Sequence, residues 1–255
     1  MGQLFVEPDM YGSRYIRSVE LPAEQIPDRR YPFNIPAIRH LGRLPLHPRV
    51  TFFVGENGTG KSTLTEAIAA LVDLNPEGGS KHHRFETRAS ESRLKDYLRI
   101  QRGIMRETDG FFLRAEGMYN VATSLEELGI SPSSYGGVPL HSRSHGEAFL
   151  AVAIHRFRGN GLYVMDEPES ALSPRRQIEM VKRIHLLAET KNSQFIIATH
   201  SPILLSYPQS VIYQFDNDGI SEVEYDETEI FRTMRDFTSS PDIFLHHLLG
   251  DLSFD

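Results

Sequence analysis

The sequence predicts an α/β protein with a mainly parallel sheet and helices on both faces. One observation is the regular alternation of helix and strand patterns in the second half of the chain, at 145–158, 162–165, 174–190 and 194–199. The other is a β-branched and aromatic run at 49–54, which a glycine-rich loop joins to a helical stretch at 62–72. Strands that alternate with helices are typical of parallel sheets, because the helices make the crossover connections.

The remaining segments are assigned from turn residues and alternation. The first fifty residues, with alternation at 15–21 and frequent prolines, predict an antiparallel β edge. The triplet at 108–110 predicts a turn, and an Asn-Asp-Gly sequence predicts a hairpin between 211–215 and 220–225, followed by two short helices. We expect a single domain over 1–255, with an inserted lobe at 73–143.

Composition limits the chemistry and the location. The chain has 255 residues, of which 40% are apolar, so it can build one large core. It has no cysteine, which excludes disulfides, thiolate metal sites and a cysteine nucleophile. Its apolar runs are too short to cross a bilayer, so direct membrane insertion is not expected. The first residues lack the pattern of an export signal, and we expect a cytoplasmic protein.

Charge is distributed unevenly along the chain. The formal net charge of −7 argues against a wholly basic nucleic-acid-binding surface. Between 81 and 106, however, eight Lys or Arg residues stand against three acids. This basic lobe is either a solvated face or a surface for a nucleic acid or an acidic protein partner.

A complete phosphate-binding motif lies between the first predicted strand and its helix. It fits G-x-x-x-x-G-K-[ST], and its residues are Gly55, Glu56, Asn57, Gly58, Thr59, Gly60, Lys61 and Ser62. Backbone N–H groups of such a loop and of the following helix N-terminus point at phosphates. We expect Lys61 to reach the β and γ phosphates, Ser62 to bind Mg²⁺, and Thr63 to lie nearer the α phosphate. The sequence therefore predicts binding of ATP with Mg²⁺.

Two acids follow the buried strand at 162–165. Asp166 stands at the carboxyl end of this strand, where it can hold Mg²⁺ through water. Glu167 is placed to accept a proton from the attacking water as a general base. With both acids and Lys61 present, hydrolysis of ATP is feasible in this chain.

Two downstream segments make the resemblance to a known superfamily specific. The run Pro-Glu-Ser-Ala-Leu-Ser-Pro at 168–174 and Ala-Thr-His-Ser-Pro at 198–202 resemble the ABC-type P-loop ATPases in order and spacing. The resemblance implies a D-loop at 170–173 and a catalytic switch histidine at His200. It also implies a signature loop at Ser144 and Gly146, which would bind the γ phosphate held by a second copy. Ser144 with Glu147 also fits an ordinary capping box, and both interpretations can hold together.

Two further positions of the superfamily pattern stay open. The Q-loop residue is either Gln101 or Glu116, and we prefer Glu116, which we assign to the metal site with Ser62 and Asp166. The aromatic residue that stacks on adenine is Tyr31 or Phe33, although an aromatic residue beside proline is more often packed in a core.

The resemblance implies ATP hydrolysis coupled to closure of an ATP-dependent homodimer. Glu-Asn-Gly-Thr-Gly-Lys-Ser and Ala-Thr-His-Ser-Pro look closer to the RecF- and SMC-like soluble branch, with small AAA-family ATPases, than to transporter subunits. This branch suggests a nucleic-acid or protein partner. The alternative is the nucleotide-binding subunit of an ABC transporter. A non-catalytic ATP switch is disfavoured because Lys61, Asp166, Glu167 and His200 are all present, and a GTPase is excluded because the Asn-Lys-x-Asp motif is missing.

Overall fold

The main sheet forms the centre of the molecule. The computed structural model describes residues 15–75, 78–80 and 93–250. In spatial order the sheet contains β5 (Asp109–Arg114), β6 (Gly161–Asp166), β7 (Gln194–Ala198), β3 (Val50–Gly55), β8 (Ser210–Phe215) and β9 (Ile220–Val223). Neighbouring strands are parallel except for the β8–β9 hairpin. The predicted α/β class with a mainly parallel sheet is confirmed.

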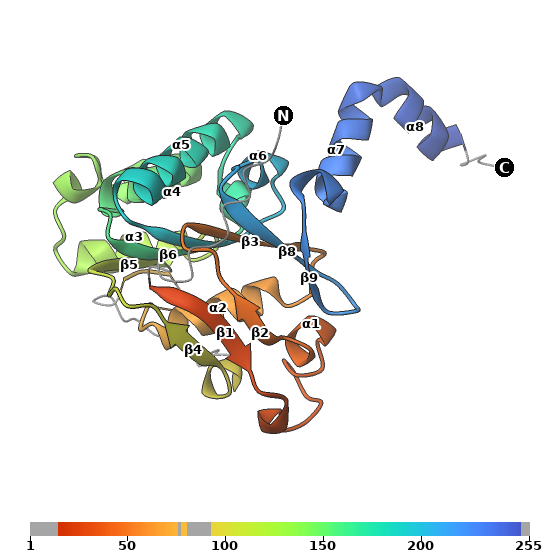
Figure 1. The fold of residues 1–255 in the computed structure, drawn as a ribbon. Helices are drawn as coiled ribbons and strands as arrows, with labels where there is room; N and C mark the ends of the chain where they lie inside the picture. Colours follow the sequence, from red (N-terminus) through yellow and green to blue (C-terminus); the bar gives the residue numbers. More distant parts are fainter. Residues whose placement is uncertain (1–14, 76–77, 81–92, 251–255) are drawn as a thin grey trace.

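Helices cover one face of the main sheet (Figure 1). They are α3 (Met118–Glu127), α4 (His145–Ala151), α5 (Pro174–Thr190) and α6 (Pro202–Leu205). A π-helical turn at Val152–Arg156 continues α4 toward β6, so the predicted helix at 145–158 is present but not uniformly α-helical. Together with the sheet these helices enclose the first hydrophobic core.

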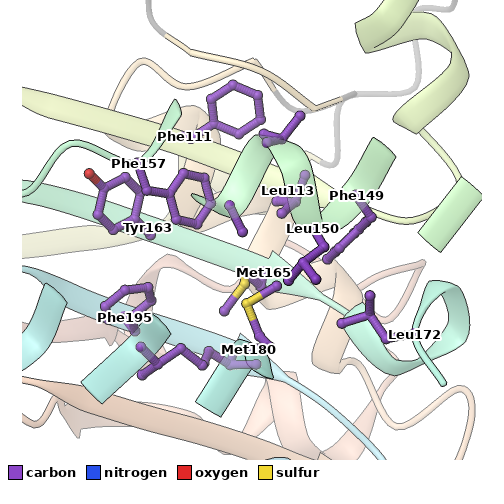
Figure 2. Close-up of a cluster of buried hydrophobic side chains, with 14 of the residues drawn as sticks. Phe111, Leu113, Phe149, Leu150, Phe157, Tyr163, Met165, Leu172, Met180 and Phe195 are labelled. Atoms are coloured by element: carbon purple, nitrogen blue, oxygen red, sulfur yellow. The ribbon is translucent and has the colours of Figure 1, made fainter. Parts of the chain in front are cut away.

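Aromatic and sulfur-containing side chains fill this first core (Figure 2). Phe111, Tyr163 and Phe195 come from three neighbouring strands and are fully or almost fully buried. The ring of Phe157 stacks on Tyr163 with centroids 4.1 Å apart, and Met180 from α5 lies beside Met165 of β6. Close packing of this kind fixes the strands from which the site residues extend.

The second face of the main sheet packs on α2 (Lys61–Leu71) and on a separate three-stranded sheet. That sheet is antiparallel, in the order β2 (Gly42–Pro45), β1 (Ile16–Leu21) and β4 (Arg99–Arg102), and α1 (Pro36–Arg39) lies near it. Successive residues of β3, such as Phe52 and Phe53, point into opposite cores, as expected for a strand buried on both faces.

The structure changes two expectations about the first half of the chain and leaves a third untested. The N-terminal strand belongs to its own antiparallel sheet and not to an edge of the main sheet. The predicted turn at 108–110 is wrong, because Asp109 and Gly110 begin β5. The span 73–143 supplies β4 to one sheet and β5 to the other. Its boundaries as a lobe, and the single domain over 1–255, stay predictions, and residues 81–92 of the basic lobe lie outside the described ranges.

The chain ends in two helices that project from the body, α7 (Glu229–Ser239) and α8 (Pro241–Gly250) (Figure 1). Neither contains a buried residue. Phe237 and Phe244 pack edge to face between them, with ring centroids 5.6 Å apart. Within the described ranges, no helix combines the length and the apolar character needed to cross a bilayer.

Candidate active site

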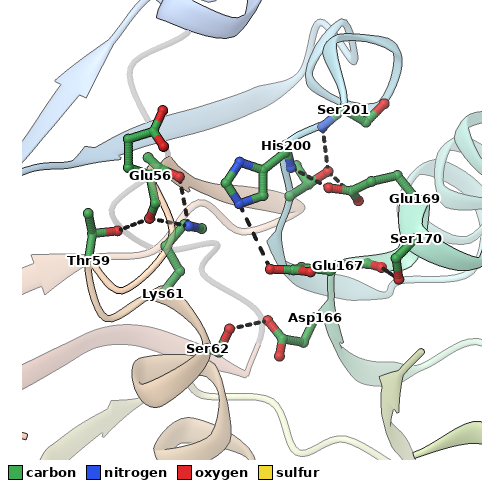
Figure 3. A network of polar contacts seen from close by, with 12 residues as sticks. Glu56, Thr59, Lys61, Ser62, Asp166, Glu167, Glu169, Ser170, His200 and Ser201 are labelled. Atoms are coloured by element: carbon green, nitrogen blue, oxygen red, sulfur yellow. Dashed lines mark hydrogen bonds and ion pairs between the residues drawn. The ribbon is translucent and has the colours of Figure 1, made fainter. Parts of the chain in front are cut away.

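The predicted site residues meet at the carboxyl ends of three adjacent strands (Figure 3). The phosphate loop follows β3, Asp166 ends β6 with Glu167 directly after it, and His200 follows β7. In the sheet these strands lie in the order β6-β7-β3. The carboxyl ends of parallel strands share one edge of a sheet, which is where α/β proteins bind ligands. The parallel topology thus brings together residues that are more than a hundred positions apart.

Glycine is required at two positions of the phosphate loop. Gly55 has φ of +140°, and a Cβ atom there would lie 2.1 Å from the backbone oxygen of Phe215 on β8. Gly60, the residue before α2, has φ of +102°. Both conformations are strained for residues with a side chain. The loop can therefore leave β3, wrap tightly and enter α2 only with glycine at these points.

Lys61 is the first residue of α2, and its side chain turns back to the loop. Its side chain is 4% exposed, and Nζ donates hydrogen bonds to the backbone oxygens of Gly55 at 2.7 Å and Glu56 at 2.8 Å. Burial lowers the pKa of the ammonium, while the carboxylates of Glu167 and Asp166 oppose that shift. The residue places a positive charge between the loop and the two acids.

Asp166 and Ser62 form the part of the site that suits a magnesium ion. The Ser62 hydroxyl donates to Oδ1 of Asp166 at 3.0 Å, and Nε of Arg114 lies 3.4 Å from Oδ2. Burial raises the pKa of Asp166 to about 6, although Arg114 and Ser62 oppose the shift. Hydroxyl and carboxylate oxygens are hard ligands, and Mg²⁺ commonly takes one or two protein ligands together with substrate phosphates. The donor set therefore fits Mg²⁺ bound with a nucleotide.

Magnesium bound in this way does not need a cage of protein ligands. Within the described part of the chain, no group of three or more His, Cys, Asp or Glu side chains is arranged to hold a metal ion by itself. A site shared between protein and phosphate oxygens is consistent with that finding.

Glu167 and His200 face each other across the site. Oε1 of Glu167 lies 3.8 Å from Nε2 of His200. This Nε2 atom is buried and has no hydrogen-bond partner among the described residues, and burial, followed by the charge of Lys61, lowers the histidine pKa. Glu167 also adopts a left-handed backbone conformation with φ of +46° and ψ of 53°. Strained backbone and buried unpaired atoms concentrate at functional sites.

Arg114 and Glu169 were not among the predicted residues. The Arg114 guanidinium contacts three carboxylates, those of Asp166, Glu66 and Glu116. Glu169, three positions after Asp166, accepts hydrogen bonds from the Thr199 hydroxyl and the His200 backbone N–H. A charged residue within the apolar run at 111–115 and a third acid after the strand at 162–165 were the sequence signals for them.

Ser144 stands at the N-terminus of α4 and is exposed. Its backbone N–H and its hydroxyl both donate to Oε2 of Glu147, at 3.0 and 2.7 Å, as in the predicted capping box. Arg176 pairs with the same carboxylate at 3.0 Å. Gly146 is buried, and a Cβ atom there would lie 2.4 Å from the backbone oxygen of Ala171. The contacts of Ser144 are those of a helix cap, and its predicted dimer role requires a second chain.

The open positions of the superfamily pattern are now placed. Glu116 follows β5, and its side chain is 84% exposed. Its Oε2 lies 3.4 Å from the Arg114 guanidinium, which also contacts Asp166. Gln101 lies on β4, where its side chain bonds Ser18 and Arg43 in the small sheet. Glu116 thus lies near the site and Gln101 does not, while a metal contact of Glu116 stays a prediction.

The two aromatic candidates differ sharply in exposure. Phe33 is fully buried, and its ring packs against Tyr97 with centroids 5.1 Å apart. Tyr31 is 62% exposed, and its hydroxyl lies 3.0 Å from Oγ1 of Thr63 in the first turn of α2. Phe33 is therefore unavailable for stacking on a base. Tyr31 has an accessible ring beside the phosphate loop.

Comparisons with known proteins give a family match and several relatives. Residues 129–206 match the family described as "AAA domain, putative AbiEii toxin, Type IV TA system". The thiamine import ATP-binding protein ThiQ of Haemophilus influenzae is 26% identical over 189 residues, covering 67% of this chain and 85% of the relative. The energy-coupling factor transporter ATP-binding protein EcfA1 of Staphylococcus saprophyticus is 24% identical over 229 residues, covering 77% of this chain and 84% of the relative.

A solved structure shares the fold. The chain is similar to a structure described as "an inward-facing conformation of a putative metal-chelate type ABC transporter", with a TM-score of 0.50 and 16% identity, covering 87% of this chain and 88% of that one. The sequence relatives are named as ATP-binding proteins, and the family match covers the acids at the end of β6 and His200 but not the phosphate loop. Together these comparisons support a relationship of the chain to the ABC-type P-loop ATPase superfamily.

Proposed function

We propose that this chain binds ATP with Mg²⁺ and hydrolyses it at the edge formed by β6, β7 and β3. The observation that carries the proposal is the buried, unpartnered Nε2 atom of His200. It lies within 4 Å of Glu167, at the strand ends that also hold Lys61 and Asp166. A γ phosphate in this place would supply the missing partner for Nε2 and the negative charge that Lys61 faces.

Each residue has one role in the proposed reaction. Lys61 leaves the carbonyl oxygens of its own loop and binds the β and γ phosphates. Glu167 accepts a proton from the attacking water while the new phosphorus–oxygen bond forms and the bond to the leaving ADP oxygen breaks. His200 donates a hydrogen bond to the γ phosphate. Tyr31 offers an exposed ring for the adenine base.

Ser62 and Asp166 are the residues that would hold the magnesium ion, with Glu116 nearby. When bound with the nucleotide, Mg²⁺ neutralises charge on the phosphate oxygens. Arg114 keeps Asp166 in place, because its guanidinium lies against Oδ2 while Ser62 bonds Oδ1. The carboxylate is thus oriented by two protein groups before any substrate arrives.

Substitution of Glu167 by Gln tests the proposal. The amide cannot accept a proton from water, so steady-state ATP hydrolysis should fall by at least about a hundredfold while ATP binding persists. Turnover is measured by phosphate release and binding by calorimetry. Glu179→Gln, an exposed position on α5, is the matched control and should keep normal turnover. Near-normal hydrolysis by the Glu167→Gln protein would show that another group activates the water.

The coupled process has two candidates. The basic lobe at 81–106 supports a nucleic-acid or acidic protein partner, and in its described part Arg102 already pairs with Glu107 at 3.1 Å. The sequence relatives, whose names denote import and transporter ATP-binding proteins, favour a nucleotide-binding subunit of a transporter. ATP hydrolysis measured with and without single- and double-stranded DNA and RNA separates them. Stimulation supports the first candidate, and its absence at low salt favours the second.

A further inference from the structure

Glu169 is a carboxylate that the proposed reaction does not use. It lies in a short 3₁₀ helix, Pro168–Ala171, that follows Glu167 directly. Burial raises its pKa, and hydrogen bonds from the His200 N–H and the Thr199 hydroxyl oppose the shift. No ion pair in the described part of the chain engages this carboxylate. Burying a carboxylate costs free energy unless hydrogen bonds or ion pairs compensate it, so the two hydrogen bonds to Glu169 are what stabilise it here.

The two oxygens of Glu169 hold two consecutive residues at the end of β7. Oε2 accepts a hydrogen bond from Oγ1 of Thr199 at 2.7 Å. Oε1 accepts one from the backbone N–H of His200. Figure 3 shows the Glu169 side chain reaching from the segment after β6 to the backbone that carries the imidazole. The carboxylate therefore joins the general-base segment to the histidine segment.

A second chain of hydrogen bonds supports the same junction. The Thr199 hydroxyl accepts from the N–H of Ser201 at 3.0 Å. The Ser201 hydroxyl donates to Gln177 at 2.6 Å, and Gln177 donates to the backbone oxygen of Leu172 at 2.8 Å. The backbone at 199–201 is thus tied at both ends to the segment between β6 and α5. From this hydrogen-bonded backbone, the His200 ring extends toward Glu167.

We propose that Glu169 is a positioning residue for ATP hydrolysis, which fixes the Thr199–His200 backbone so that the imidazole stays beside Glu167 and the γ-phosphate position. This inference rests on the proposed function of the site. Supporting groups of this kind set the geometry of the residues that touch substrate, and a displacement of about 1 Å at a reacting group can cost about a hundredfold in rate. Glu169 itself touches neither phosphate nor water in this account.

Three substitutions at one position test the inference. Glu169→Ala removes both hydrogen bonds and should lower kcat by about 10- to 100-fold, with the Kd for ATP changed by less than about threefold. Glu169→Gln can still accept from the His200 N–H and donate to the Thr199 hydroxyl, so it should recover most of the lost kcat. Glu169→Asp is too short to reach both groups and should resemble Ala. A Gln variant as inactive as Ala would overturn the inference, because the charge and not the hydrogen bonds would then matter.

A double-mutant cycle with His200 provides a readout that a general structural role would not give. If Glu169 acts through His200, adding Glu169→Ala to His200→Ala should lower kcat by no more than about twofold further. Fully additive losses would show that Glu169 acts independently, which contradicts the inference. Thr199→Val removes one of the two hydrogen bonds to Glu169, together with the hydrogen bond from the Ser201 N–H to the same hydroxyl, and leaves the His200 N–H bond in place, so it should give an intermediate kcat. It keeps the inference testable if Glu169→Ala does not fold, as judged by circular dichroism and thermal unfolding.

The failure of this inference is distinguishable from the failure of the proposed function. If Glu167→Gln and His200→Ala both retain normal turnover, the assigned site is wrong whatever Glu169 does. If those two variants lose turnover while Glu169→Ala retains it with normal kcat, the site stands and only the positioning role of Glu169 is refuted.

Discussion

Arg114 determines the charge balance around the candidate site. Its guanidinium contacts the carboxylates of Glu66, Asp166 and Glu116, and only the last of these acids is strongly exposed. Because Arg114 and Asp166 are register partners on adjacent strands, the pair is placed by the sheet itself. A buried acid pair without this cation would be costly to ionise. One arginine therefore allows several acids to lie close to the predicted magnesium position.

Lys61 gives the first prediction at this scale. Replacement of Lys61 by Ala removes the positive charge that faces the β and γ phosphates, so the affinity for ATP should fall by at least about tenfold, or about 1.4 kcal/mol. Calorimetric titration with a non-hydrolysable ATP analogue measures it. Lys182→Ala, on the exposed side of α5, is the control and should bind normally. An affinity for the analogue equal to that of the control would contradict the assigned role of the loop.

Asp109 gives a prediction about pH. Burial opposes ionisation of this carboxylate, but Arg156 at 2.6 Å, the Tyr163 hydroxyl at 2.7 Å and the N–H of Arg158 outweigh it and lower its pKa. A lowered folded-state pKa stabilises the protein above the unfolded value of about 3.9, and this stability is lost as pH falls through the folded-state value. Asp109→Asn should therefore cost about 1–3 kcal/mol of unfolding free energy at pH 7.

The difference in stability between Asp109→Asn and the unchanged protein should shrink below about pH 4. Urea unfolding at several pH values between 7 and 3.5 measures it. Asp242→Asn on the exposed helix α8 should show no such trend. A cost that stays constant over the whole range would mean that ionisation of Asp109 contributes nothing to stability.

Motif residues were predictable at the residue scale, and their supporting residues were not. The fixed spacing within the phosphate loop predicted Lys61 and Ser62. The position of two acids directly after a buried strand predicted Asp166 and Glu167. Arg114 and Glu169 act through contacts between strands and loops that are far apart in the sequence. Asp109 resembled a turn residue beside glycine, whereas its carboxylate is a buried anchor for Arg156 and Tyr163.

Strongly periodic elements were predicted nearly to the residue. The helix expected at 174–190 is α5 with the same bounds, and the strand expected at 194–199 is β7 (Gln194–Ala198). In α5 the buried residues recur at helical spacing, and β7 is a short, continuously buried run, so in both elements packing and local preference agree. The small sheet was not predicted as a separate unit, because β1 pairs with β4 from a distant part of the sequence and short strands do not reveal their partners.

The terminal helix α8 gives a prediction at the element scale. Its described residues include none that is buried, and Ile243, Leu248 and Leu249 are each more than half exposed. It adds little to the core, so a chain that ends at Ser240 should keep its unfolding free energy within about 0.5 kcal/mol. Urea unfolding followed by circular dichroism tests this. A loss of several kcal/mol would show that α8 covers part of the body in solution.

At the scale of the whole molecule, the parallel sheet explains why the site is assembled at one edge. The order β6-β7-β3 sets the acids, the histidine and the phosphate loop side by side, and two cores on opposite faces of the sheet hold the strands in register. The alternation of elements predicted this class of fold. The strand order β5-β6-β7-β3-β8-β9 was not predicted, because it depends on long-range pairing that periodicity does not reveal.

The last prediction concerns association of two chains. A single phosphate loop leaves the outer side of a γ phosphate open, and the hydrogen bonds of Ser144 among the described residues are those of the α4 cap. A helix N-terminus binds anions, so two copies can each complete the other's site only when ATP is present.

In the Glu167→Gln background, which prevents turnover, light scattering with ATP and Mg²⁺ should give about twice the monomer mass, and ADP should not. Adding Ser144→Arg places bulk and charge at this surface and should restore the monomer, while Ser239→Arg on α7 should not. If the Glu167→Gln protein stays monomeric with saturating ATP, or its dimer tolerates Ser144→Arg, then Ser144 serves only as the cap of α4, and this chain does not form the ATP-bound dimer by itself.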